Sequence, residues 1–81
     1  MDTQFFDVVL VQAGNKKIDV IMALRDATTK ETSIKMIELS TAKQFVDAAP
    51  CVIANTVTQE VGERVKLRLE KAGATVELRP A

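Results

Sequence analysis

Few side chains in this sequence are of the types that carry out covalent or acid–base chemistry. The chain has no histidine and a single cysteine, Cys51. Histidine is the commonest general base and the commonest metal ligand in proteins, so its absence removes both from consideration. Cys51 lies in the apolar run Cys51-Val52-Ile53-Ala54, where we expect a small buried hydrophobic side chain rather than a nucleophile. We therefore predict a protein that is not an enzyme and that needs no cofactor or metal ion.

Carboxylate pairs and glycine-containing turns are the remaining features that could support catalysis or phosphate binding. The acid pairs Glu60/Glu63 and Asp2/Asp7 fall on an expected helix surface and near the N-terminus, positions typical of solvated charge. The segment Ala-Gly-Asn-Lys-Lys at 13–17 follows a predicted strand but is too short to cradle a phosphate. Both features are therefore interpreted as ordinary surface and turn chemistry.

Overall charge and hydropathy indicate which kinds of partner the chain binds. The 11 lysines and arginines balance the 11 aspartates and glutamates, so no general field attracts nucleic acid or an anionic membrane. The aromatic residues Phe5, Phe6 and Phe45 fall at strand or helix positions rather than on an expected base-stacking surface. The sequence contains no apolar run of about 18 residues and opens on no signal-peptide pattern. We expect a cytoplasmic domain whose partner is another protein.

The clearest helix in the sequence, KKIDVIMALRDAT at 16–28, has two apolar faces. One face recurs at spacings of three, four and seven residues: Val20, Ala23, Leu24 and Ala27. The other repeats this spacing on roughly the opposite side: Ile18, Ile21, Met22 and Arg25. A surface helix needs only one apolar stripe. The second stripe is either covered by another helix of the chain or is a docking surface rimmed by Lys17 and Arg25. The docking interpretation requires Ile18, Ile21 and Met22 to be solvent-exposed.

The other elements follow from periodicity and from helix start and stop signals. We predict strands at 5–11, 51–57 and 75–79, and further helices at 40–49 and 58–72, with Ser40 and Thr58 as N-caps. The polar, threonine-rich segment 29–39 is predicted to be an irregular excursion with some local structure. The element order predicts one α+β domain over residues 1–81, a two-layer βααβαβ arrangement with a small, mainly antiparallel three-stranded sheet and three helices on one face.

The first strand has apolar residues on both of its faces. Phe6, Val8 and Leu10 are expected to face the core, and Phe5, Val9 and Val11 the opposite side. This second side is more apolar than a solvated sheet face usually is. Either the 29–39 excursion shields it, or it pairs with a second copy of the chain to form a homodimer. The sequence leaves both alternatives open.

Two long stretches of the sequence resemble a known family. FDVVLVQAGNKKIDVIMALRDAT at 6–28 and AAPCVIANTVTQEVGERVKLRLEKAGATVELR at 48–79 are similar to the C-terminal domain of the bacterial ribosomal stalk protein, the L7/L12 family. The family's Phe-Asp-Val strand, its Ala-Gly turn, its Ala-Pro and its Ala-Gly-Ala-x-Val-Glu ending occur here in order. The likeness extends over nearly the whole chain except about residues 29–36.

The resemblance implies a compact α+β domain that binds translational GTPases, the elongation factors, through its first two helices. Carried over position by position, the family's basic and apolar contacts fall on Lys17, Ile18, Ile21, Arg25 and Lys43. Met22 lies among them on the second face of the 16–28 helix, and these six residues form the predicted partner-binding site.

The chain departs from the family pattern at this same surface. Met22 stands where the family keeps a lysine, Asp19 where it has a small residue, and Asp26 where it has a glycine. The 29–39 segment is an insertion that replaces a tight Gly-Leu-Gly connection between the first two helices. These changes make the expected surface less positive, and charge complementarity mainly governs encounter rate and partner choice. The alternative function is therefore a stand-alone adaptor or homodimeric binding module that is not attached to the ribosome, as the adaptors of the Clp protease system use a related topology.

Overall fold

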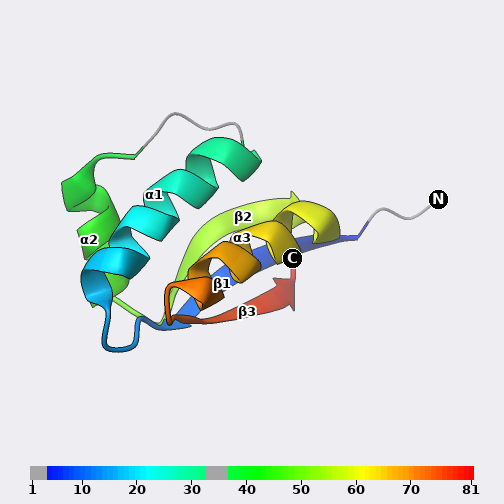
Figure 1. Cartoon of the computed structure of the whole chain (residues 1–81). Helices are drawn as coiled ribbons and strands as arrows, with labels where there is room; N and C mark the ends of the chain where they lie inside the picture. The colour runs from blue at the N-terminus through cyan, green and yellow to red at the C-terminus, as the bar shows by residue number, and fades with distance from the viewer. Residues whose placement is uncertain (1–3, 33–36) are drawn as a thin grey trace.

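Three strands and three helices follow one another in the predicted order. The computed structural model describes residues 4–32 and 37–81. Within them the elements are β1 (Phe5–Gln12), α1 (Lys17–Thr32), α2 (Leu39–Asp47), β2 (Cys51–Thr58), α3 (Gln59–Lys71) and β3 (Thr75–Pro80). The central strand β1 pairs antiparallel with both β2 and β3, and the helices gather on one side of the sheet (Figure 1). The predicted α+β class and two-layer arrangement are confirmed.

The core fills the space between the sheet and the helices. Its largest fully buried side chains come in pairs from three elements, β1, α1 and α3: Val8, Leu10, Val20, Leu24, Val65 and Leu69. Helix α3 lies directly on the sheet, and α1 packs against both α2 and α3 (Figure 1). The predicted core face of α1 is confirmed, because Val20, Leu24 and Ala27 are buried.

Two glycines fix the point where the chain leaves β1 and enters α1. Gly14 has φ +79° and Gly73, at the end of α3, has φ +101°, both in the left-handed region that favours glycine. A Cβ atom placed on Gly14 would lie 2.5 Å from the carbonyl oxygen of Gly73. The turn before α1 therefore approaches the turn after α3 more closely than any side chain would allow.

The helix boundaries differ from the predicted ones around the 29–39 segment. Helix α1 continues to Thr32 rather than stopping at residue 28. In its last turns the hydroxyl of Thr28 donates to the Leu24 carbonyl at 2.9 Å, and that of Thr29 to the Arg25 carbonyl at 2.8 Å. Helix α2 begins at Leu39, with Glu38 in the N-cap position, so the prediction of Ser40 as N-cap is wrong. Thr58 does cap α3, accepting from the Val61 amide at 3.3 Å.

The sheet face opposite the helices is less available than the sequence predicts. Val9 is only 3% exposed. It lies in the central strand between Val52 of β2 and Glu77 of β3, and directly opposed residues share a face and cover one another. The prediction of Val9 as an exposed contact is therefore wrong, whereas Phe5 is exposed and Val11 half-buried. The described parts of the 29–39 segment lie on the helix side and do not shield this face, while the predictions for 33–36 fall outside the described residues.

Candidate functional site

Helix α1 lies between α2 and α3 (Figure 1). One strip of its side chains stays exposed. Ile18 is 76% exposed and Met22, one turn later, is 52% exposed. Soluble domains carry single exposed apolar residues routinely, but two on successive turns of one helix face form the start of a patch. The predicted exposure of Ile18 and Met22 is confirmed.

Ile21 does not belong to this exposed strip. It is 8% exposed and shares the core cluster with Ala42 and Val46 of α2. The expectation that Ile21 is wetted beside Ile18 and Met22 is wrong, because α2 packs on that side of α1. A second helix therefore covers Ile21, whereas Ile18 and Met22 meet solvent. The docking interpretation keeps two of the three exposed side chains that it requires, and it stays a prediction.

Leu39, the first residue of α2, adds a third apolar side chain that the sequence analysis missed. It is 54% exposed. The sequence placed it in the irregular excursion, where no helical period marks its orientation, and only the observed start of α2 reveals it. The predicted site residues that are exposed or half-buried, together with Leu39, are called the α1–α2 surface. They are Lys17, Ile18, Met22, Arg25, Leu39 and Lys43.

The three basic residues of the α1–α2 surface stand in different surroundings. Lys43 is exposed on α2. Lys17 places its Nζ 3.9 Å from Oδ1 of Asp47, an exposed ion pair worth at most about 1 kcal/mol. Arg25 is half-buried, and its Nε donates to the carbonyl oxygen of Ile37 at 3.0 Å. Lys17 and Lys43 therefore form the solvated rim of the surface, while Arg25 joins α1 to the segment that precedes α2.

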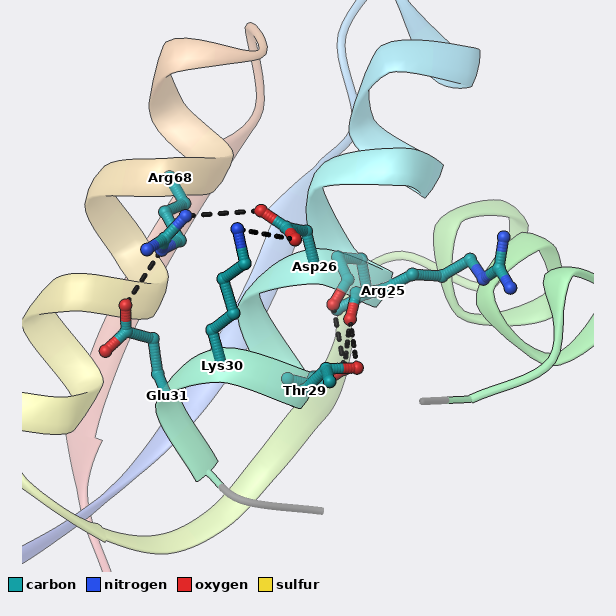
Figure 2. Close-up of polar contacts among 8 residues, drawn as sticks. Arg25, Asp26, Thr29, Lys30, Glu31 and Arg68 are labelled. Atoms are coloured by element: carbon teal, nitrogen blue, oxygen red, sulfur yellow. Dashed lines mark hydrogen bonds and ion pairs between the residues drawn. The ribbon is translucent and has the colours of Figure 1, made fainter. Parts of the chain in front are cut away.

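The opposite flank of α1 carries a cluster of ion pairs with α3 (Figure 2). Arg68 donates from Nε to Oε2 of Glu31 at 2.8 Å and from Nη1 to Oδ2 of Asp26 at 3.2 Å. Lys30 also lies 3.2 Å from Asp26, and Arg64 lies 3.8 Å from Glu31, whose side chain is only 11% exposed. Asp26 thus faces α3, beside the expected docking surface and not on it, and its charge is paired with Lys30 and Arg68. Asp26, Lys30, Glu31, Arg64 and Arg68 are called the ion-pair cluster below.

The structure offers little for chemistry at the remaining reactive groups. Cys51 is half-buried, and its thiol donates to the Phe45 carbonyl with a sulfur–oxygen distance of 3.1 Å. Burial raises the pKa of the Cys51 thiol, which keeps it in the neutral form that is a poor nucleophile. Across residues 4–32 and 37–81, no three His, Cys, Asp or Glu side chains are grouped to hold a metal ion. Over the same ranges, the helices are too short or too polar to cross a membrane.

Comparison with known proteins finds relatives that match nearly the whole chain. The family model for the ribosomal protein L7/L12 C-terminal domain matches residues 6–79. The large ribosomal subunit protein bL12 of Pseudomonas putida (strain GB-1) is 47% identical over 74 residues, which cover 91% of this chain and 55% of that protein. The bL12 protein of Moorella thermoacetica is 43% identical over 74 residues, covering 91% of this chain and 53% of its own length. The chain thus spans about half the length of the curated relatives it matches.

Proposed function

The chain belongs to the ribosomal protein L7/L12 C-terminal domain family, and from this premise we propose that it binds translational GTPases through the α1–α2 surface. Family membership supports a role in the ribosomal stalk. The resemblance described above assigns contact with elongation factors to the first two helices. In this chain the same two helices carry the exposed apolar side chains Ile18, Met22 and Leu39.

These three exposed apolar side chains are the observation that carries the proposal. Covering apolar surface contributes about 25 cal/mol per Å², which gives about 1–2 kcal/mol for the exposed part of each of these side chains before the costs of association. Interfaces typically combine such an apolar centre with a polar rim. Lys17 and Lys43 supply this rim on α1 and α2 respectively. The area is small, so we expect a transient complex rather than a permanent one.

The proposal is tested by titrating a purified translational GTPase, loaded with a non-hydrolysable GTP analogue, into the chain and its Ile18→Asn variant by calorimetry. Because Ile18 is exposed, the variant should fold normally, and we expect its affinity for the GTPase to fall about tenfold or more. Leu67→Asn is the control, since Leu67 is an exposed apolar residue on α3, away from the α1–α2 surface, with 53% of its area exposed against 76% for Ile18. Equal affinities for the wild type and both variants would contradict the proposal.

A second titration separates the basic rim from the apolar centre. Lys43→Glu should weaken binding several-fold at low ionic strength and less at high salt, because screening reduces interactions between exposed charges. Lys71→Glu makes the same change of charge at an exposed position on α3 and serves as its control. The rim assignment fails if the two variants lose affinity equally.

One observation favours the adaptor as a second candidate. Met22 is exposed where the resemblance calls for a lysine, so the surface presents more apolar area and less positive charge than the family pattern implies. An adaptor would bind a different client through the same residues, and wild type would then bind no elongation factor. The homodimer through the sheet face stays a prediction, which sedimentation at micromolar concentration tests.

A further inference from the structure

Arg25 joins two elements that together make up the proposed binding surface. Its side chain leaves α1 and reaches toward the segment that precedes α2 (Figure 2). There its Nε donates to the carbonyl oxygen of Ile37 at 3.0 Å, a contact twelve residues away in the sequence and partly shielded from solvent. Hydrogen bonds with an ionised donor are roughly twice as strong as neutral ones. The guanidinium therefore acts inside the molecule, on a backbone group at the entrance to α2.

That backbone group lies two residues before the start of α2. Residue Glu38 follows Ile37 directly, and its carbonyl oxygen accepts the first hydrogen bond of α2 from the Ala42 amide at 3.0 Å. The N-cap Glu38 makes no side-chain cap, so the local side-chain bond that commonly fixes a helix start is missing here. The hydrogen bond from Arg25 holds the chain at Ile37, one residue before the cap. Leu39 comes immediately after the cap, and Lys43 one turn later.

We propose that Arg25 is a positioning residue for the α1–α2 surface: by holding the Ile37 carbonyl, its guanidinium sets where α2 begins and hence where Leu39 and Lys43 lie relative to Ile18 and Met22. The resemblance assigned Arg25 the role of a cationic contact with the partner. The observed hydrogen bond to Ile37 gives it a role in the geometry of the surface. The consequence for partner affinity rests on the proposed function, whereas the effect on the start of α2 does not.

Amide hydrogen exchange in the isolated chain tests the effect on α2. In Arg25→Met, which keeps a similar unbranched stem but removes the donor, exchange of the Ala42 amide should accelerate about fivefold to tenfold, as expected for the loss of one charge-assisted hydrogen bond. The Val20 amide, bonded to the Lys16 carbonyl at the start of α1, is the internal control and should be unchanged. Unchanged Ala42 exchange would overturn the proposal.

The Arg25→Lys variant distinguishes the hydrogen bond to Ile37 from the positive charge of the side chain. Lysine keeps the positive charge, but its donors lie at the end of a flexible stem and not at the Nε position of arginine. We expect faster Ala42 exchange and weaker GTPase binding to appear together in Arg25→Lys, with the salt dependence of binding as in wild type. Full affinity in Arg25→Lys, or affinity lost without any change in Ala42 exchange, would identify a direct charge contact and overturn the proposal. If wild type binds no GTPase, the proposed function fails, while the exchange data still decide the role of Arg25.

Discussion

The two long flanks of α1 use their side chains in opposite ways. On the flank facing α3, the acids Asp26 and Glu31 meet Lys30, Arg64 and Arg68 at 2.8–3.8 Å. On the adjoining strip, where Met22 stands one helical turn before Asp26, Ile18 and Met22 of α1 face solvent. Charges that already pair within the molecule have little to gain from a partner, whereas exposed apolar atoms gain wherever a partner removes water. The proposed binding site therefore lies where apolar side chains of α1, and not paired charges, meet solvent.

This comparison changes how the departures from the family pattern are interpreted. Asp19 and Asp26 both add negative charge to α1, but only Asp19 lies exposed, one residue from Ile18. Asp26 is neutralised locally by Lys30 and Arg68. The electrostatic difference from the family at the α1–α2 surface is therefore smaller than the sequence alone indicates.

The sharpest contrast uses two isoleucines three residues apart. Ile21→Ala should lower the free energy of unfolding by about 2–4 kcal/mol, because it removes buried methyl groups from a core that α2 covers. Ile18→Ala should leave stability within about 0.5 kcal/mol, because its side chain is already in water, yet should weaken partner binding. Urea unfolding followed by circular dichroism measures the first effect, since the chain has no tryptophan or tyrosine for fluorescence. Equal destabilisation by the two variants would mean that the exposed strip does not exist as described.

The flank that faces α3 is tested by a double-mutant cycle on Glu31 and Arg68. Each of Glu31→Gln and Arg68→Gln should lower stability by about 1 kcal/mol, with a coupling energy of about 0.5–1 kcal/mol, since Glu31 is largely shielded and bonded to two arginines. Measuring the cycle again at about 0.5 M salt should reduce the coupling, because screening acts on the partly exposed members of the ion-pair cluster. Neither variant should change affinity for the GTPase. A loss of binding equal to that of Ile18→Ala would show that the two flanks are not independent.

Sequence periodicity was sufficient to predict the positions of the strands and the buried face of α1. Val20, Leu24 and Ala27 recur at helical spacing. Such an apolar stripe predicts the buried face of a helix even when the element that packs against it is unknown. Periodicity did not predict the burial of Ile21. A helix packed on two sides buries a wider arc than a single stripe, and the sequence does not say that α2 returns against α1. Val9 was misassigned for the same reason, because its cover comes from two strands distant in sequence.

The end of α1 was missed because its stabilising contact is not local. Thr28 and Thr29 are β-branched and disfavour a helix interior, so the sequence predicted an end at Thr28. Glu31 belongs to the added turn and bonds Arg68, a residue 37 positions later. No pattern within the segment contains that pairing. Leu39 and the tether from Arg25 to Ile37 were missed on the same ground, since both depend on how α2 returns to α1.

The smallest expected effect compares the same change of charge on the two flanks. Met22→Lys and Asp26→Asn each make the chain more positive by one unit, the first on the exposed strip and the second within the ion-pair cluster. If the partner presents acidic groups, as the basic contacts implied by the family resemblance require, Met22→Lys should raise the association rate about two- to threefold and steepen its salt dependence. Asp26→Asn should raise the rate less, because the positive charge that it leaves unbalanced on Arg68 and Lys30 lies toward α3 and not at the α1–α2 surface. Stopped-flow association with the GTPase at low and high salt measures both variants. Equal acceleration would show that the overall charge of the domain, and not the placement of charge on α1, governs the encounter.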